Sequence, residues 1–262
     1  MPQSKTWRES PLGGGPLGQL HGIYGRAAEL DQLRHRLRSR RPFLFHGPAG
    51  VGKSLLLSVV VPESPRILYS GQNPTSQVMY RNLAESLLAA CHPVFANSCT
   101  GGSPSLHAKS TLSLKGLLRD ALLNSEYLVV LDHLVRPSQP LAAAVRELML
   151  NWSVAVVAVT RSAHMEDAGF VLSLFADRRE KLALRNFDPD TGRQFAEECA
   201  KQEGLAADNL AQFLGRVVEC SDGNPGAILR LVRMAKDPRY SNQRRIKTTP
   251  LCIDYKISMV SQ

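Results

Sequence analysis

The sequence has few cysteines and no long apolar run, and each of these shortages excludes a class of protein. Its five cysteines are scattered over 262 residues and form no C-x-x-C pair, so we expect neither a disulfide framework nor a zinc site. No apolar run approaches the roughly 18 residues that a membrane-spanning helix needs, and the amino-terminal segment lacks the apolar core of a signal peptide. We therefore expect a cytoplasmic protein without a membrane partner.

The overall composition is that of a globular protein. Hydrophobic residues make up 44% and charged residues 21% of the chain, which excludes a disordered, collagen-like or coiled-coil protein. A chain of 262 residues is long enough for one large domain, or for one domain and a smaller companion, with a core that needs no covalent staples.

The positive charge lies at the two ends of the chain. The formal net charge is +9, of which residues 1–41 contribute +5 and residues 238–262 contribute +4. The residues between them carry nineteen charges of each sign. Basic ends favour an anionic partner such as DNA, and they are equally typical of flanks that only keep a protein in solution. Both interpretations stay open.

Apolar runs of strand length alternate with helical patterns through the first two thirds of the chain. Such runs, apolar on both faces, are typical of parallel strands covered by helices on either side. After Phe187 the pattern changes to helices alone, at 188–204, 207–221 and 225–236. The strand-like runs are 43–45, 66–70, 127–132, 154–160 and 181–187.

A glycine-rich motif follows the first of these runs and opens a helix. Residues 47–54, GPAGVGKS, match G-x-x-x-x-G-K-S in full. Glycines let backbone N–H groups turn towards phosphates, and the helix that starts near Gly52 directs its positive end at them. Lys53 reaches the β- and γ-phosphates, and Ser54 is placed to ligate Mg²⁺. We expect ATP or ADP to be held by Gly47, Pro48, Ala49, Gly50, Val51, Gly52, Lys53, Ser54 and Leu55.

A carboxylate closes the apolar run at 127–132. Asp132 suits the second Mg²⁺ contact of an ATPase, usually made through water; the alternative is a turn or helix-cap aspartate. The next residue is His133, at a position where many ATPases carry the glutamate that activates water. His133 is either a substitute that positions water or a surface histidine, and in both cases we expect slow hydrolysis.

Five short segments, in this order, resemble a known group of ATPases. The order is similar to that of the AAA+-related signal-transduction ATPases called STAND, and of the origin-recognition type ATPases near them, over residues 22–237. The resemblance implies an ATP-dependent molecular switch. The segments are Ile23-Tyr-Gly-Arg26-x-x-Glu29-Leu, GPAGVGKS, LVVLD, Val159-Thr-Arg161 and Gly223-Asn-Pro225.

The resemblance implies further contacts with the base and ribose of the nucleotide. Tyr24, Gly25 and Arg26 lie in the segment that contacts adenine and ribose in that group. Pro225 would pack on adenine, although a proline at the first position of a helix is also ordinary helix chemistry.

The resemblance also implies positive charges near the γ-phosphate. Arg161 is similar to the residue that senses this phosphate, and with Lys53 and Asp132 it completes the expected catalytic set. Arg178 and Arg179 resemble the finger that reaches a neighbouring subunit's nucleotide. Related lids carry an arginine soon after the glycine that precedes the third lid helix, Gly223 here; this chain has Gly226 at that place and, one turn later, Arg230 as a substitute.

We therefore predict an α/β protein, a P-loop NTPase three-layer sandwich with a parallel sheet, followed by a small all-helical lid domain. The segment 245–255 would form a strand pair or remain disordered. The predicted parts are a flexible leader at 1–20, an ATPase domain at 21–187, the lid at 188–237 and a basic tail at 238–262.

Three functions fit these observations. The first is an ATP-binding switch with slow Mg²⁺-dependent hydrolysis that acts on a protein partner or assembles as a homo-oligomer. The second is a DNA-associated ATPase of transposition or replication, supported by the basic ends; residues 238–262 are too few for a winged helix. The third is a nucleotide-binding scaffold with little hydrolysis, which His133 supports.

Overall fold

The computed structural model describes residues 23–95, 106–242 and 244–260 and divides the chain into two compact units. The first unit, called the sheet unit here, comprises residues 28–47 and 56–184. The second, the helical unit, comprises residues 23–27, 48–55 and 185–260 among those described. The predicted leader at 1–20 lies outside the described residues.

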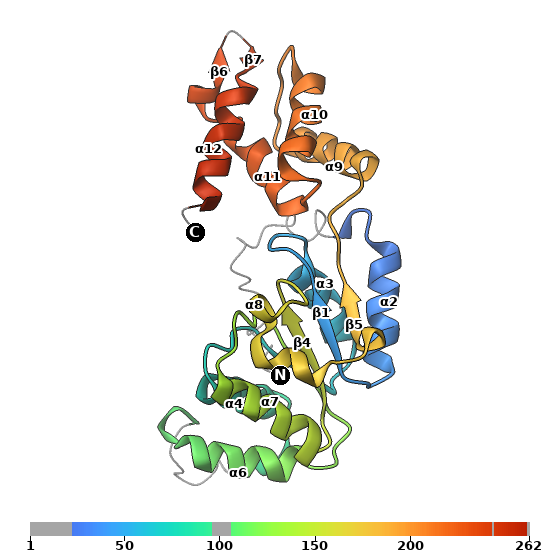
Figure 1. The fold of residues 1–262 in the computed structure, drawn as a ribbon, viewed down its shortest axis with the longest axis vertical. Helices are drawn as coiled ribbons and strands as arrows, with labels where there is room; N and C mark the ends of the chain where they lie inside the picture. The colour runs from blue at the N-terminus through green and yellow to red at the C-terminus, as the bar shows by residue number, and fades with distance from the viewer. Residues whose placement is uncertain (1–22, 96–105, 243, 261–262) are drawn as a thin grey trace. The chain divides into compact units, whose positions relative to one another are not determined.

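The sheet unit is built on five parallel strands in the order β2-β3-β4-β1-β5, of which Figure 1 labels β4, β1 and β5. The register places Phe45 opposite Val159 and Leu182, so β1 is paired on both sides, with β4 and with β5. The predicted parallel sheet is confirmed. The strands are β1 (Phe43–His46), β2 (Ile67–Ser70), β3 (Leu128–Leu131), β4 (Ala155–Thr160) and β5 (Lys181–Ala183).

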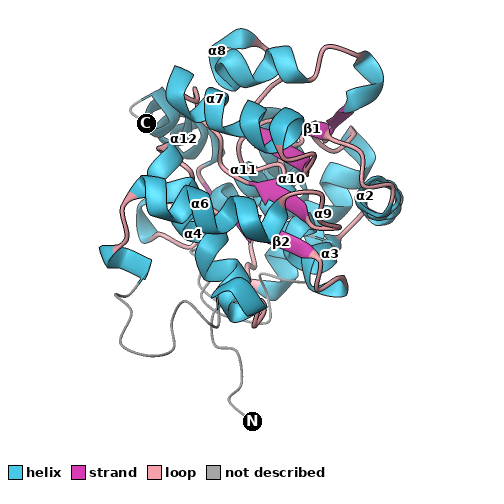
Figure 2. Ribbon diagram, turned by 90° about the horizontal axis from the view of Figure 1, so that it is seen from below, coloured by secondary structure: helices cyan, strands magenta, loops and turns pink. Residues whose placement is uncertain are grey.

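Helices flank the sheet, as Figure 2 shows. The helix α4 packs against both α6 and α7, and the three bury Leu83, Leu118 and Val145 in one core with β2, β3 and β4. A five-residue π-helix at Glu147–Asn151 continues α7. The helices that begin in or belong to this part of the chain are α2 (Ala27–Arg38), α3 (Lys53–Val60), α4 (Ser76–Ala89), α6 (Thr111–Leu122), α7 (Gln139–Arg146) and α8 (Met165–Ala168).

The helical unit has a core of its own. Phe195, Phe213 and Ile228 are fully buried in it, one from each of its first three helices. Its elements are α9 (Pro189–Gln202), α10 (Leu210–Ser221), α11 (Pro225–Met234), β6 (Ser241–Asn242), β7 (Arg245–Ile246) and α12 (Thr248–Val260). Within the described parts of the chain, no helix is long and apolar enough to cross a membrane.

The strand predicted at 181–187 is shorter in the structure. β5 ends at Ala183, and Leu184 still donates its N–H to the carbonyl of His46. Phe187 instead packs in the core of the helical unit, with its ring centroid 5.4 Å from that of Phe195. The last apolar residues of this run therefore leave the sheet because a second core binds them.

The C-terminal segment differs from both expected alternatives. A short antiparallel pair forms between β6 and β7, but residues 248–260 form the helix α12, so neither a strand pair nor disorder describes them. Leu251 and Tyr255 of α12 are buried against α10 and α11. The Asn209 side chain bonds both the N–H and the carbonyl of Ile246, at 2.8 and 3.0 Å, and so holds the hairpin.

We expect α12 to contribute to the stability of the helical unit. Leu251 is 0% exposed, so Leu251→Ala should lower the free energy of unfolding by about 2–5 kcal/mol. Ile253→Ala is the matched control, since Ile253 is 52% exposed and exposed substitutions usually change stability by about 0.5 kcal/mol or less. Urea denaturation followed by circular dichroism measures both. Equal midpoints for the two variants would contradict the packing of α12.

Candidate functional site

The glycine-rich motif at residues 47–54, called the phosphate loop here, adopts backbone conformations that only glycine tolerates well. The loop connects β1 to α3, with φ of +79° at Gly50 and +104° at Gly52. α3 begins at Lys53, whose Nζ donates to the carbonyl of Pro48 at 3.0 Å. Ser54 is the second residue of that helix. The motif therefore forms a turn followed directly by a helix N-terminus, which is the arrangement that binds phosphates.

Within the helical unit, the phosphate loop is hydrogen-bonded to the turn that opens α11. Asn224 donates from Nδ2 to the carbonyl of Ala49 at 2.9 Å. Gly226 donates its backbone N–H to the carbonyl of Gly50 at 3.0 Å. Asn224 also caps α11, because its Oδ1 accepts from the N–H of Ala227 at 3.1 Å.

The approach of these two segments leaves no room for a side chain. A Cβ at Gly226 would lie 2.9 Å from the Gly50 carbonyl oxygen and 3.0 Å from its Cα. A Cβ at Gly50 would lie 2.8 Å from Oδ1 of Asn224. Pro225, the residue expected to touch adenine, is buried in the first turn of α11. Its adenine contact stays a prediction.

Tyr24, Gly25 and Arg26 pack on the aromatic core of the helical unit. The Tyr24 ring lies 5.7 Å from that of Phe195, centroid to centroid. Arg26 is only 3% exposed; its guanidinium lies 4.3 Å from the centre of the Phe187 ring and donates to the Arg185 carbonyl at 2.7 Å. Gly25 has φ of +64°. Arg26 thus has a clear structural role, and the nucleotide contacts of this segment stay predictions.

In the sheet unit, Asp132 follows β3 directly and is held by several donors. Its side chain is 1% exposed, with Oδ2 accepting from the Tyr69 hydroxyl at 2.8 Å and Oδ1 from the N–H of His133 at 2.7 Å. Asn73 donates to the Asp132 carbonyl at 3.0 Å. Burial, and then the neighbouring negative charge and hydrogen bond of Asp132, raise the pKa of Tyr69 far above its usual value. The carboxylate is therefore fixed in orientation.

His133 has a left-handed backbone and a solvent-facing side chain. Its φ is +52°, which is uncommon for a residue other than glycine. The side chain is 53% exposed, and its Nε2 lies 3.8 Å from Oδ2 of Asp132. His133 is therefore adjacent to the carboxylate and also open to water.

The arginines predicted to act near the γ-phosphate of this or a neighbouring chain are exposed. Arg161 follows β4 directly, after the buried Thr160. Arg178 and Arg179 lie in the short helix Arg178–Glu180, and the Arg179 carbonyl accepts from Arg36 at 2.6 Å. These positions leave the guanidinium groups of Arg161, Arg178 and Arg179 at the surface.

Arg230, the substitute considered for the lid arginine, has partners on α12. Its Nη2 donates to the hydroxyl of Ser258 at 3.0 Å, and its guanidinium lies 5.7 Å from the centre of the Tyr255 ring. Both partners lie in the segment that the sequence did not predict to be helical. Arg230 therefore helps to attach the C-terminal helix to α11.

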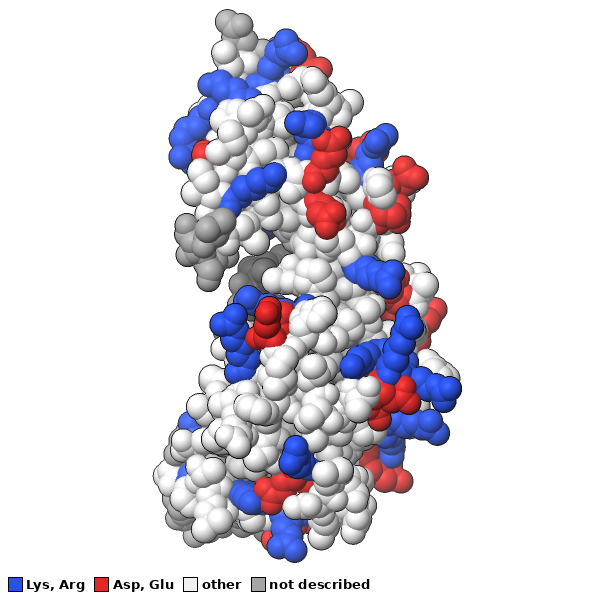
Figure 3. Space-filling view, viewed as in Figure 1, with Lys and Arg blue, Asp and Glu red and all other residues white. Residues whose placement is uncertain are grey.

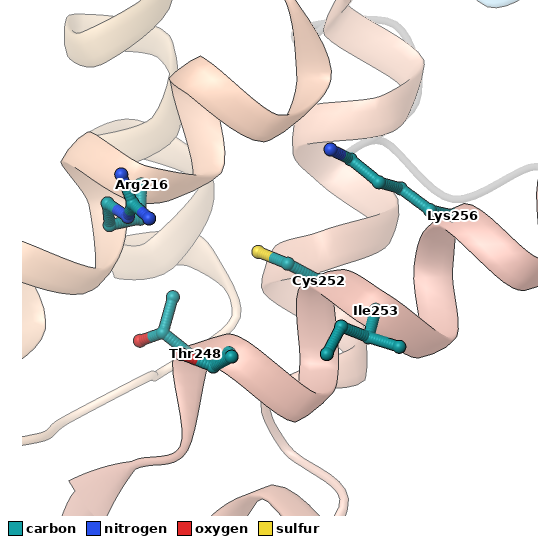
Figure 4. Close-up of a pocket in the computed structure, with 6 residues that line it drawn as sticks. Arg216, Thr248, Cys252, Ile253 and Lys256 are labelled. Atoms are coloured by element: carbon teal, nitrogen blue, oxygen red, sulfur yellow. The ribbon is translucent and has the colours of Figure 1, made fainter.

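The C-terminal elements of the helical unit also carry a pocket and a basic surface. Residues 238–262, which include the hairpin and α12, hold five basic residues and one acidic residue, and lysine and arginine gather over this part of the unit in Figure 3. None of the predicted site residues lines the pocket. Figure 4 shows the pocket, which is lined by Arg216, Thr248, Thr249, Cys252, Ile253 and Lys256.

Sequence reasoning missed several polar residues of the candidate site. Asn224 belongs to the Gly223-Asn-Pro225 segment, and an asparagine before proline is a recognisable helix cap. Its second bond, to the phosphate loop, has no sequence signal. Tyr69 and Asn73 had none either, because their link to Asp132 joins residues 63 and 59 positions apart.

Solved structures of low sequence identity share this fold. A Walker-type ATPase of Pyrococcus abyssi matches with a TM-score of 0.60 and 16% identity, over 91% of this chain and 74% of that chain. Cdc6p from Pyrobaculum aerophilum matches with a TM-score of 0.56 and 13% identity, over 81% and 61% of the two chains. The Orc1 protein of Aeropyrum pernix, solved in complex with DNA, matches with a TM-score of 0.54 and 16% identity, over 90% of this chain and 65% of that chain.

These similarities define the class of fold. The chain has the fold of AAA+ P-loop ATPases, a parallel five-stranded sheet with flanking helices followed by a helical region. The resemblance to origin-recognition type ATPases is thus confirmed at the level of the fold. The chain spans less than two thirds of the length of the Cdc6p and Orc1 chains. No protein-family model and no curated protein sequence matches it.

We expect the Tyr69 hydroxyl to stabilise the protein in a pH-dependent way. Since the folded-state pKa of Tyr69 is raised above its ordinary value of 10.0, its contribution is present below about pH 10 and is lost as the pH rises further. Tyr69→Phe should cost about 1–3 kcal/mol near pH 7, because the buried Asp132 carboxylate loses a donor. Above about pH 10 the difference from the parent should shrink, by up to about 1.4 kcal/mol per pH unit.

Tyr80→Phe provides the comparison for this measurement. Burial, and then the charge of Glu147, raise the pKa of Tyr80 to about 12. Its loss should alter the alkaline limb of the stability curve without affecting Asp132. Denaturant titrations between about pH 7 and 11 give the three curves. Parallel curves for the parent and Tyr69→Phe would be incompatible with the Tyr69–Asp132 interaction.

Proposed function

We propose that this protein is an ATP-binding switch of the AAA+/STAND type that hydrolyses ATP slowly with Mg²⁺. The observation that carries the proposal is the complete phosphate loop, with Gly50 and Gly52 in left-handed conformations directly before the N-terminus of α3. Such a turn presents backbone N–H groups and a positive helix end to a polyphosphate. The AAA+ fold supports the same reading of the motif.

In this proposal, a small set of residues binds the phosphates and the metal ion. Lys53 contacts the β- and γ-phosphates, and Ser54 and Asp132 supply the hydroxyl and carboxylate oxygens that Mg²⁺ prefers. The orientation of Asp132, fixed by Tyr69 and His133, suits a carboxylate that acts through a metal-bound water. When bound, Mg²⁺ neutralises negative charge that develops on the phosphates.

The base and ribose would be recognised by residues of the helical unit. Tyr24 offers an aromatic face and Gly25 a close backbone approach, while Pro225 lies in the helix that follows the loop-bound turn. Arg26 acts behind them, since its guanidinium stacks on Phe187 and is buried. We therefore assign Arg26 to holding this segment and not to direct contact with the nucleotide.

A DNA-associated ATPase is the second candidate. Two observations favour it: the basic hairpin and α12, and the similarity in fold to an Orc1 protein that was solved in complex with DNA. DNA binding through phosphate contacts would weaken steeply as salt is raised. The switch remains the first candidate because the phosphate loop is specific for nucleotides, whereas a basic surface is not.

We expect Lys53→Ala to abolish tight ATP binding, because the ammonium group that contacts the phosphates is lost. Isothermal titration calorimetry measures the affinity, with Lys201→Ala as a control for removal of an exposed lysine. In the same titration, Asp132→Asn should retain part of the affinity and lose its dependence on Mg²⁺. An unchanged affinity in Lys53→Ala would remove the phosphate loop from the site.

We expect turnover of the isolated chain to be well below the median enzyme value of about 10 s⁻¹. The exposed His133 stands where a water-activating glutamate is usual, so His133→Glu should raise the rate. If Arg178 or Arg179 acts on a neighbouring subunit, the rate should rise faster than linearly with protein concentration, since such a finger contributes about 10³–10⁵ in rate. The double variant Arg178→Ala, Arg179→Ala should then lose only the concentration-dependent part.

A phosphate-release assay over a range of protein concentrations decides this. A fast rate that is strictly proportional to concentration would mean that one chain completes the catalytic site, contrary to the proposed role of His133.

A further inference from the structure

Two consecutive carbonyl groups of the phosphate loop are bonded by residues outside the loop. The Ala49 carbonyl accepts from the side-chain amide of Asn224 at 2.9 Å, and the Gly50 carbonyl accepts from the N–H of Gly226 at 3.0 Å. Both donors lie in the turn that begins α11. Since phosphates are bound by N–H groups, these carbonyl contacts do not compete with a nucleotide for the same atoms.

A bond to a carbonyl fixes the direction of the N–H in the same peptide unit. The described chain contains no cis peptide bond, and in a planar trans peptide the C=O and N–H bonds point in opposite directions. Holding the Ala49 carbonyl therefore sets the direction of the Gly50 N–H. Holding the Gly50 carbonyl sets the same for Val51, whose N–H makes a long bond of 3.4 Å to Pro48.

We propose that Asn224 and Gly226 are positioning residues for phosphate binding: they hold the peptide units at 49–51 so that the loop is preorganised for the phosphates. This inference rests on the proposed function, because it assumes that the loop binds a nucleotide. According to this inference, part of the affinity for ATP comes from residues outside the loop motif. The first turn of α11, 175 residues further along the chain, contributes to the shape of the phosphate site.

Glycine is required at position 226 for this contact. Any side chain there would place its Cβ 2.9 Å from the Gly50 carbonyl oxygen and 3.0 Å from the Gly50 Cα, both of which are backbone atoms. Backbone atoms cannot rotate away as a flexible side chain can, so the turn and the loop would have to separate. A substitution at Gly226 should therefore act on the loop even though Gly226 is exposed and the mutated residue lies outside the motif.

Asn224 has two functions that can be separated by substitution. Its Oδ1 caps α11 through Ala227, whereas its Nδ2 donates to Ala49 and, at 3.1 Å, to Oδ1 of Asn186. Serine is a comparable helix cap without a charge, and it lacks the amide donor. Asn224→Ser should thus keep the helix and release the loop.

The experiment measures ATP affinity by calorimetry for the parent, Asn224→Ser and Gly226→Ala. Loss of one such hydrogen bond should lower the affinity of Asn224→Ser about five- to tenfold, and Gly226→Ala should lose more. Gly215→Ala is the matched control, because a Cβ at Gly215, on α10 of the same unit, meets open space. Its affinity should equal that of the parent.

A second readout separates positioning of the loop from a general loss of structure. Amide hydrogen exchange of the nucleotide-free protein should be faster at Val51, whose N–H bonds Pro48, in Asn224→Ser, while the amides of α11 remain protected as in the parent. This comparison does not need ATP. If Gly226→Ala fails to fold, Asn224→Ser still tests the proposal, because it retains the helix cap.

The outcomes distinguish the two proposals. Equal ATP affinity and equal exchange at Val51 in parent and Asn224→Ser overturn the positioning role and leave the proposed function intact. An equal loss of protection throughout α11 overturns it as well, because the effect would then be structural. A parent protein that binds no ATP overturns the proposed function, and with it the inference.

Discussion

The parallel arrangement of the five strands is the constraint on which the sheet unit depends. In a parallel sheet all carboxyl ends meet at one edge, so the chain leaves β1 at Gly47, β3 at Asp132 and β4 at Arg161 on the same side. One residue from each of three predicted functional segments is thus brought to the same edge of the sheet by the strand arrangement alone. The same arrangement requires helical cover on both faces, which explains why β3 is apolar at every position and β4 at all but its last, Thr160.

Left-handed backbone conformations recur where the chain turns next to a predicted functional group. Gly50 and Gly52 adopt them within the phosphate loop, and Gly223 does so directly before Asn224. His133 adopts one without being a glycine, and the turn so formed directs its N–H to the Asp132 carboxylate. The conformational cost at His133 is therefore offset by a hydrogen bond that orients a buried acid.

Local patterns made much of this structure predictable. The strands are apolar runs in which neighbouring residues suffice to indicate burial, and the phosphate loop is defined by eight consecutive residues. The end of β5 was not predictable in this way, because Phe187 is equally apolar whether it joins the sheet or the aromatic core around Phe195. The apolar character of a residue predicts that it is buried, but it does not indicate in which of two cores the residue packs.

The C-terminal helix was missed for a related reason. In α12 the buried Leu251 and Tyr255 have helical spacing, but Ile253, Ile257 and Met259 are apolar and exposed. Apolar residues on both sides of the helix hide its periodicity. Pro250 added a second misleading signal, although proline is tolerated in the first turn of a helix.

The contacts of Arg230 connect that helix with the chemistry expected of the lid. The Arg230 guanidinium donates a hydrogen bond to Ser258 and lies over the Tyr255 ring. The arginine that we considered for contact with the nucleotide is therefore engaged by α12. Moving it to a phosphate would break the hydrogen bond to Ser258 and the stacking on Tyr255. The first turn of α11 instead meets the phosphate loop through the uncharged groups of Asn224 and Gly226. In this chain, therefore, the start of α11 contacts the phosphate loop through one side-chain amide and one backbone N–H, and the positive charge one turn later serves to attach α12.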